Sequence, residues 1–129
     1  RAVIDFDSDL ARKIYAGADI LLLPSRYEPC GLAQMIAMRY GCVPVVASTG
    51  GLQDTVLDYD AVPSGTGFTF SPTDADAMAI RLRRALDVFS DKRRWRGLQR
   101  RGMGQVYSWK RAAQAYSDLY QKIATVRQS

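Results

Sequence analysis

Two short segments of the sequence combine residue types that can bind a sugar or an anion. The first, residues 24–32 (PSRYEPCGL), contains Glu28, the only glutamate among the 129 residues, and ends in small residues at the predicted start of a helix. The second, residues 48–52 (STGGL), contains a glycine pair, whose backbone a ligand can approach closely because no Cβ intervenes. Free N–H groups at a helix start favour an anion or a sugar hydroxyl. If the two segments lie side by side, they predict a site for a phosphorylated ligand with a sugar at one end.

Each of these features also fits a purely structural interpretation. The glycine pair can be an ordinary turn, and Glu28 can simply complement the dipole of the helix that follows it. Cys30 has no accompanying base, so we do not expect it to act as a nucleophile. Arg26 fits a solvent-exposed position as well as a phosphate contact. Phe6 fits either a core position or stacking against a purine.

The composition excludes several kinds of site. The chain contains no histidine, which excludes a Ser-His-Asp or Cys-His apparatus, an imidazole proton shuttle and a histidine-ligated metal. Its two cysteines, Cys30 and Cys42, are too few for a structural zinc site or for the disulfide framework of a small secreted protein. We therefore expect no metal, no cofactor and a reducing, cytosol-like compartment.

Length and hydropathy predict one folded domain. Apolar residues make up 47% of the chain and charged residues 24%, as in ordinary folded domains of this length. The apolar run at residues 20–24 is far shorter than the roughly 20 residues of a membrane span. No signal-peptide pattern opens the chain. Because the first residue is Arg1 rather than methionine, we expect the sequence to begin inside a longer protein or after processing.

Charge is divided unevenly along the chain. Residues 1–80 contain 5 basic and 10 acidic residues, whereas residues 81–129 contain 13 basic and 3 acidic residues. The arginines of the basic part alternate with apolar positions at helical spacing, and no motif that reads nucleic acid accompanies them. We interpret them as solvent-exposed helix faces, with contact to another acidic surface as the alternative, and expect no nucleic-acid partner.

The order of strands and helices predicts an α/β fold with a parallel sheet. Short apolar runs alternate with helical patterns, which is typical of a doubly wound sheet, although three or four strands are fewer than a complete one has. In such sheets ligands bind at the carboxyl ends of the strands, where residues 24–32 and 48–52 fall. The predicted strands are residues 2–6, 20–23, 43–47 and 67–70, and the predicted helices between them are residues 8–16, 31–40 and 52–57.

Some details of these elements are also predicted. The continuous apolar run 20–23 indicates a strand covered on both faces. Pro44 indicates that strand 43–47 lies at an edge of the sheet or that Pro44 opens the strand. Ser8 or Asp9 is expected to cap the first helix, and Gly41 to end the second in a left-handed conformation.

The last third of the chain, about residues 73–125, is predicted to be a helical tail. Thr73, Asp91 and Ser108 are expected to cap three successive helices. Apolar residues of the last helix share one face, which is predicted to pack inward, and the neighbouring aromatic residues are interpreted as core. These residues are Tyr107, Trp109, Ala112, Ala113, Tyr116, Leu119, Tyr120 and Ile123.

The two ligand-binding segments together resemble one family. Residues 16–56, which contain EPCGL and STGGL at this separation, closely resemble the C-terminal nucleotide-binding domain of bacterial glycogen synthases and plant starch synthases. Residues 65–78 (GTGFTFSPTDADAM) and 108–120 (SWKRAAQAYSDLY) are similar to the same family. The resemblance therefore covers almost the whole chain.

This resemblance implies a fold and an activity. Such proteins are retaining glycosyltransferases with two Rossmann-like domains that face each other across a cleft, the GT-B arrangement. Residues 1–129 would form a truncated C-terminal domain, a partial Rossmann-like parallel sheet with flanking helices. The enzymes transfer glucose from ADP-glucose, less often UDP-glucose, to the non-reducing end of an α-1,4-glucan and need no metal. Their acceptor glucan contacts the N-terminal domain, so this chain alone is expected to be inactive. The implied compartment is the bacterial cytoplasm or the plastid stroma, without a membrane partner.

The resemblance also implies roles for individual residues. Glu28 would be the catalytic carboxylate beside the donor glucose. Backbone N–H groups around Cys30, Gly31 and Leu32 would bind sugar hydroxyls, and Thr49, Gly50 and Gly51 would contact the diphosphate and the sugar. Phe6 would lie near the nucleotide base. Such a site works by electrostatic placement rather than by proton transfer through histidine.

Two alternatives remain open. One is a retaining glycosyltransferase with another donor or acceptor, such as a sucrose synthase-like or trehalose-forming enzyme. Against it stands Ile36, eight residues after Glu28, because those relatives usually have a second glutamate there. The other alternative is a non-catalytic module that binds a nucleotide sugar or interacts with another subunit.

Overall fold

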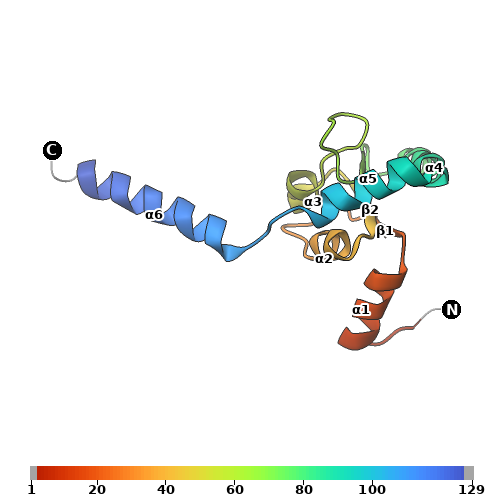
Figure 1. Ribbon diagram of the computed structural model, residues 1–129, viewed down its shortest axis with the longest axis horizontal. Coiled ribbons are helices and arrows are strands. Elements are labelled where there is room, and N and C mark those ends of the chain that lie inside the picture. Colours follow the sequence, from red (N-terminus) through yellow and green to blue (C-terminus); the bar gives the residue numbers. More distant parts are fainter. Residues whose placement is uncertain (1–2, 127–129) are drawn as a thin grey trace.

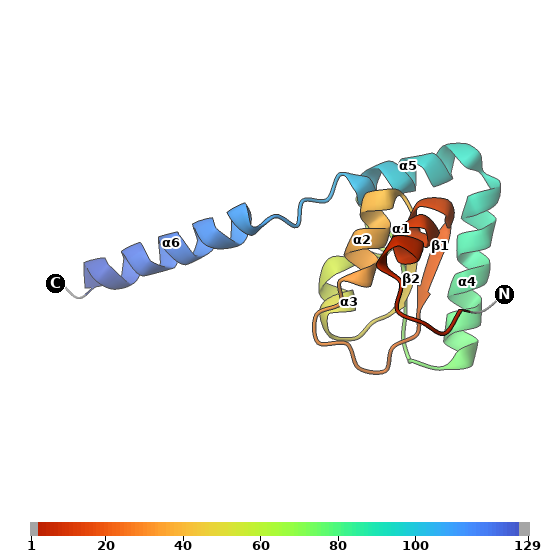
Figure 2. The same cartoon turned by 90° about the horizontal axis from the view of Figure 1, so that it is seen from below.

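A three-stranded parallel sheet with helices on both faces organises the computed structural model, which describes residues 3–126 (Figures 1 and 2). This arrangement confirms the predicted fold class. In chain order the elements are α1 (Ser8–Gly17), β1 (Ile20–Leu23), α2 (Ala33–Tyr40), β2 (Val43–Ala47), α3 (Gly50–Thr55), β3 (Phe68–Phe70), α4 (Ala75–Ser90), α5 (Lys92–Met103) and α6 (Trp109–Val126).

Strand β2 lies at the centre of the sheet, between β1 and β3. Pro44 therefore does not mark an edge strand, but it does lie near the start of β2. The ladder to β1 includes Pro44, opposite Leu21, whereas the ladder to β3 begins one residue later, at Val45 opposite Phe68. The missing N–H of Pro44 is tolerated because the residue precedes the β3 ladder. Strand β1 is an edge of the sheet and is only partly buried, so the prediction that it is covered on both faces is wrong.

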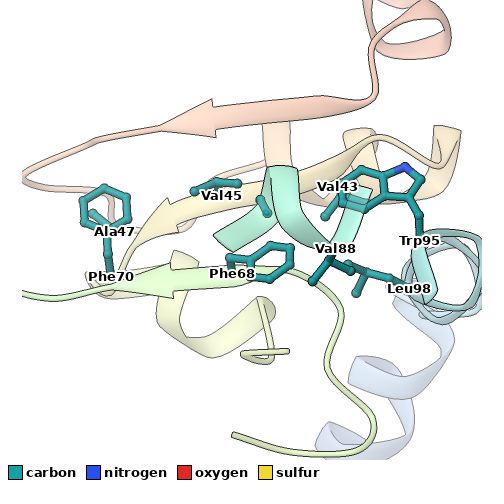
Figure 3. Close-up of a cluster of buried hydrophobic side chains, with 9 residues drawn as sticks. Val43, Val45, Ala47, Phe68, Phe70, Val88, Trp95 and Leu98 are labelled. Carbon is teal, nitrogen blue, oxygen red and sulfur yellow. The ribbon is translucent and has the colours of Figure 1, made fainter. Parts of the chain in front are cut away.

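The main core lies between the sheet and the helices α4 and α5. Alternate residues of β2 point to one face, as the period of a strand requires. Figure 3 shows Val43 and Val45 of β2 and Phe68 of β3 together with Val88 of α4 and Trp95 of α5. Full burial of each such side chain contributes about 1.5–3 kcal/mol. On the opposite face, a smaller cluster holds α2 and α3 against β2 through Met38, Val46, Leu52 and Val56.

Aspartates cap three of the helices. The Asp7 carboxylate accepts from the N–H groups of Asp9 and Leu10 at the start of α1, one or two residues before the predicted caps. Asp74, rather than Thr73, caps α4, and Asp91 caps α5 as predicted. A short polar side chain one or two residues away competes equally well for the same free N–H groups, so sequence alone places such a cap only to within a residue or two.

Three backbone segments differ from the predicted elements. Helix α3 covers Gly50–Thr55 rather than residues 52–57, because the glycine pair itself forms the first turn of the helix. Residues 3–6 are exposed and form no strand, and Ala2 lies outside the described residues. Helix α2 begins at Ala33 rather than residue 31, because Gly31 has a φ of 71°, a left-handed conformation that ends regular helix geometry. At the other end of α2, Gly41 has the predicted left-handed conformation, with a φ of 82°.

Helix α6 points away from the rest of the structure (Figures 1 and 2). Its apolar face is largely exposed: Tyr116, Leu119, Tyr120 and Ile123 are 61%, 49%, 65% and 53% accessible. Tyr107 and Trp109 are exposed as well. The prediction that these residues pack in a core is wrong for the described residues, because helical periodicity indicates an apolar face but not the surface that covers it. No helix within residues 3–126 is long and apolar enough to cross a membrane.

Candidate functional site

The two predicted ligand-binding segments follow neighbouring strands of the sheet. Residues 24–32 connect β1 to α2, and residues 48–49 connect β2 to α3. Because β1 and β2 are parallel and adjacent, their carboxyl ends lie at the same edge of the sheet. The fold therefore brings together the two segments that sequence analysis singled out.

The backbones of the two segments are in direct contact. The Gly51 N–H donates to the Glu28 carbonyl oxygen over 3.0 Å. A Cβ atom on Gly50 would lie 1.9 Å from that same oxygen, and a Cβ on Gly51 would lie 1.9 Å from the Cys30 carbonyl oxygen. Both distances are far below any real contact, and Gly50 also has a positive φ of 45°. The glycine pair is therefore required by the close approach of the segments, and it leaves Glu28 at their junction.

The remaining predicted residues surround this junction. The Glu28 side chain is half-buried, Cys30 is exposed, and Leu32 is 66% exposed. The Thr49 hydroxyl donates to the Arg26 carbonyl oxygen in a long hydrogen bond of 3.5 Å, while the Arg26 side chain remains exposed. The segment after β1 is thus held by its backbone carbonyls, and its side chains remain available to a ligand.

The N-terminus of α2 lies beside the junction of the two segments, directly after residues 24–32. Its N-cap is Leu32, and no side chain caps it within the described part of the chain. The first N–H groups of a helix without a cap carry partial positive charge and favour an anion or an electron-rich oxygen. This position suits the sugar hydroxyls or phosphate oxygens that the sequence predicted.

Gln34 is a residue of this site that sequence analysis missed. Its side chain is completely buried, and its amide nitrogen donates to the Gly31 carbonyl, the Thr55 hydroxyl and the Cys30 carbonyl at 2.9, 2.9 and 3.3 Å. A polar residue three positions after a glycine, on the buried side of a predicted helix, was the only signal in the sequence. It could not indicate the contact with Thr55, 21 residues later.

Phe6 is not brought to the two segments. Its ring is 94% exposed, which contradicts a core position. It borders an open hollow of about 550 Å³ between α1 and α2, lined also by Asp7, Tyr15, Ile36 and Tyr40 and by no residue of either segment. The structure therefore leaves Phe6 free to stack on a ligand but does not join it to the Glu28 site.

A separate apolar groove lies on another side of α2. Two adjoining hollows of about 470 and 560 Å³ are lined by Leu32, Met35 and Tyr107, and by Trp109 toward α6. Neither includes Glu28 or the glycine pair. The Glu28 site is instead an open surface where the two segments meet.

Charged groups are sparse at the site, and no metal centre is evident. Within residues 3–126, no three acidic or cysteine side chains gather in a way that could hold an ion. Cys42, buried directly before the central strand β2, is a poor ligand, because burial and then the nearby Asp19 carboxylate raise the pKa of its thiol to about 11. The site can therefore act through backbone N–H groups, one helix N-terminus and the single carboxylate of Glu28.

A parallel α/β sheet with a glycine pair at the carboxyl ends of its strands is an arrangement that nucleotide-binding domains use. The model of the family "Glycosyl transferases group 1" matches residues 3–97, about three quarters of the chain. The chain belongs to this family.

Similar proteins carry more specific names. A protein from Anaeromyxobacter sp. strain K named glycogen synthase is 56% identical over 123 residues, which are 95% of this chain and 26% of that protein. Glycogen synthase 2 of Geobacter sulfurreducens is 53% identical over 125 residues, again 26% of its length. The chain therefore spans about a quarter of the length of the curated relatives it matches.

A solved structure has the same fold. It is the catalytic domain of starch synthase IV from Arabidopsis thaliana bound to ADP and acarbose, with a TM-score of 0.87 and 39% identity over 95% of this chain and 26% of that one. Sucrose-phosphate synthase from Thermosynechococcus elongatus is less similar, with a TM-score of 0.68 and 29% identity over 96% of this chain and 30% of its own. The resemblance noted in the sequence is confirmed. The roles of individual site residues remain predictions.

Proposed function

We propose that the chain forms the donor-sugar half of the active site of a glucosyltransferase that builds an α-glucan. The donor would be ADP-glucose, less often UDP-glucose, and the acceptor the non-reducing end of an α-1,4-glucan, with retention at the anomeric carbon. The relatives named glycogen synthase and the similar starch synthase structure, which contains ADP and acarbose, support this proposal.

The observation that carries the proposal is the junction at Glu28. The only glutamate of the chain lies where the glycine pair approaches the start of α2, with the Gly51 N–H bonded to the Glu28 carbonyl. Positive charge develops on the donor glucose as its bond to the diphosphate breaks, and a carboxylate held beside it stabilises that charge. Glu28 would supply this carboxylate without needing to transfer a proton.

The neighbouring residues would hold the two ends of the donor. Backbone N–H groups around Cys30, Gly31 and Leu32, at the uncapped start of α2, would bind glucose hydroxyls. Thr49, Gly50 and Gly51 would contact the diphosphate and the sugar, because they follow the carboxyl end of β2, where parallel sheets bind such ligands. Phe6, with its exposed ring, would stack on the nucleotide base.

The rest of the reaction would depend on parts of a longer protein. The acceptor glucan would bind a domain outside this chain, so the isolated 129 residues would not elongate a glucan. No metal or other cofactor would take part, and activity would persist in a chelator. The two free cysteines suit a reducing compartment, the cytoplasm or the plastid stroma.

Glu28 provides the first test. In the full-length protein, Glu28→Ala and the isosteric Glu28→Gln should lower the rate of glucosyl transfer from ADP-glucose by at least tens of fold, on the order of 10²-fold, because both remove the charge that stabilises the transition state. ADP release and glucan elongation measure this rate. Asp54→Asn, at an exposed carboxylate on α3, is the matched control and should retain wild-type activity. Near-normal transfer by Glu28→Ala would overturn the assigned role.

The same assay separates the alternatives. Faster turnover of UDP-glucose or GDP-mannose than of ADP-glucose would identify a transferase with another donor. If calorimetry shows that the protein binds neither ADP nor a short maltodextrin but captures another subunit, it is an interaction module. Preference for ADP-glucose, with glucan as the acceptor, supports the proposal.

A further inference from the structure

Gln34 and Thr66 are the two polar side chains of the described residues that are fully buried. Gln34 lies on α2 directly behind the Glu28 segment. Its amide nitrogen has two hydrogens but three acceptors within hydrogen-bond distance, so one hydrogen is shared. Two of these acceptors, the carbonyls of Cys30 and Gly31, belong to the segment after β1, and the third is the Thr55 hydroxyl on α3.

Thr55 extends this connection to the glycine pair. Its hydroxyl accepts from Gln34 and donates to the Gly51 carbonyl over 2.6 Å. A partly buried chain of hydrogen bonds therefore runs from Gly31 through Gln34 and Thr55 to Gly51. Together with the direct bond from the Gly51 N–H to Glu28, it links the two site segments at two points.

The other half of the Gln34 amide has no hydrogen-bond partner. Within the described residues, the Oε1 atom is buried without a donor. A buried acceptor without a donor lowers stability, and an apolar side chain of similar length would avoid that loss. The same oxygen lies 2.6 Å from where a Cβ on Gly31 would be. The position of the Gln34 side chain therefore requires a glycine at position 31. An amide that is unfavourable for the core but bonded to both site segments indicates a role in the site.

We propose that Gln34 is a positioning residue of the donor site. Through its amide it sets the separation between the Cys30–Gly31 backbone and the glycine pair, and so aligns the N–H groups at the start of α2 with the ligand. Gln34 does not touch the donor. This inference rests on the proposed function for the identity of the ligand, but the positional role itself is independent of it.

The kinetic test uses the full-length protein. Gln34→Met keeps the length of the side chain and removes all three hydrogen bonds. We expect it to lower kcat about tenfold to a hundredfold and to raise the KM for ADP-glucose several-fold while the KM for the glucan stays unchanged, because only the donor segments are displaced. Thr66→Val is the matched control: Thr66 is equally buried, but its hydroxyl accepts from the Leu57 N–H, away from both segments. It should lower the melting temperature without changing either KM.

A second variant covers the case in which Gln34→Met does not fold. Thr55→Val breaks the same connection at its far end and leaves the buried amide intact. It should change kcat and the donor KM in the same direction, and its effect should not add to that of Gln34→Met, because both remove one connection. Additive effects, or a donor KM equal to that of Thr66→Val, would overturn the proposal.

A measurement without substrate separates this proposal from the proposed function. Hydrogen exchange of the backbone amides of Gly51 and Leu52, which donate to the Glu28 and Thr49 carbonyls, should be at least about tenfold faster in Gln34→Met or Thr55→Val than in the wild type, and unchanged in Thr66→Val. If the wild type does not transfer glucose from ADP-glucose, the proposed function fails and the exchange rates still decide the role of Gln34. Unchanged exchange in both variants would refute the positional role.

Discussion

In both Glu28 and Cys30 the backbone carbonyl forms a hydrogen bond within the protein, whereas the side chain extends toward the surface. The carbonyl of Glu28 accepts from Gly51, and that of Cys30 accepts from Gln34, while the side chains of both residues reach the surface to different extents. The backbone of this segment is thus held through its carbonyl groups, by Gly51 and Gln34.

The two cysteines should differ sharply in reactivity. Cys30 is exposed beside the glycine pair, whereas Cys42 is buried and burial raises the pKa of its thiol to about 11. We expect a thiol reagent at pH 7.5 to modify Cys30 in the folded protein and Cys42 only after unfolding, since the thiolate is the reactive form. Mass spectrometry of the modified peptides measures this order.

Modification of Cys30 should also block the donor site. In the full-length protein the Cys30 adduct should have no glucosyl transfer activity. ADP-glucose should slow the modification of Cys30. The variant Cys30→Ala should be active and should keep its activity in the presence of the reagent. Modification of Cys42 before Cys30 would contradict the burial described here. Full activity of the Cys30 adduct would place the donor elsewhere.

The loop between α3 and β3 is fastened to α4 by a cluster of ion pairs. Asp58 pairs with Arg81 and accepts from the N–H and hydroxyl of Thr69, and Asp60 pairs with Arg84 at 2.8 Å and with Arg81 at 2.9 Å. Burial acts to raise the pKa of the Asp58 carboxyl, but the Thr69 N–H and the Arg81 guanidinium outweigh it, so this pKa lies below its ordinary value. Hydrogen bonds from Arg84 lower the pKa of Asp60 in the same way.

These lowered pKa values predict a loss of stability in acid. An aspartate in the unfolded chain has a pKa of about 3.9, so as the pH falls below about 4 the unfolded state takes up protons first. The cluster should therefore contribute its full stability at neutral pH and lose it progressively below about pH 4. Asp58→Asn should lower the free energy of unfolding at pH 7 by about 1–3 kcal/mol. The free energy of unfolding should then decrease less between pH 7 and pH 3 than it does in the wild type.

Denaturant unfolding at pH 7 and at pH 3 measures both effects. Asp9→Asn is the control, because the pair between Asp9 and Arg12 is well exposed and should contribute less than about 1 kcal/mol. An equal acid loss in Asp58→Asn and in the wild type would show that the cluster is not responsible.

The structure consists of a packed α/β unit and the helix α6, which makes no extensive contact with another described element. The connection between them is held by the Tyr107 hydroxyl, which donates to the Thr55 carbonyl over 3.1 Å. Among the residues whose burial the structure describes, the core clusters include none from α6. Stability of the α/β unit should therefore depend on the chain up to Tyr107 and not on α6.

Removal of α6 tests this independence. A chain that ends at Ser108 should have a free energy of unfolding within about 0.5 kcal/mol of the 129-residue chain, as expected when exposed surface alone is lost. Tyr107→Phe, which removes the hydrogen bond to Thr55, should lower the free energy of unfolding by about 0.5–1.5 kcal/mol. Denaturant unfolding of the three proteins gives these values, and a loss of several kcal/mol on truncation would mean that α6 packs against the α/β unit.

Much of the fold and part of the site could be predicted from local patterns. The apolar runs 20–23 and 43–47, the helix that ends at Gly41 and the cap at Asp91 depend on neighbours a few residues away, so short-range physical chemistry specifies them. Parallel strands then place residues 24–32 and 48–52 at one edge of the sheet. Errors occur where local signals are nearly equal, as at Ser8 and Thr73, or where a short apolar run finds no partner strand, as at residues 3–6.

The amino-acid sequence alone determined the class of fold, the family resemblance and the presence of two candidate ligand-binding segments, one of which holds the only glutamate. Only the tertiary structure decided that the glycine pair touches the carbonyls of Glu28 and Cys30, that Gln34 joins the two segments through Thr55, and that the apolar face of α6 is exposed. The reason is physical: periodicity specifies which face of an element is apolar. Which distant backbone or side chain meets that face depends on the packing of the whole chain.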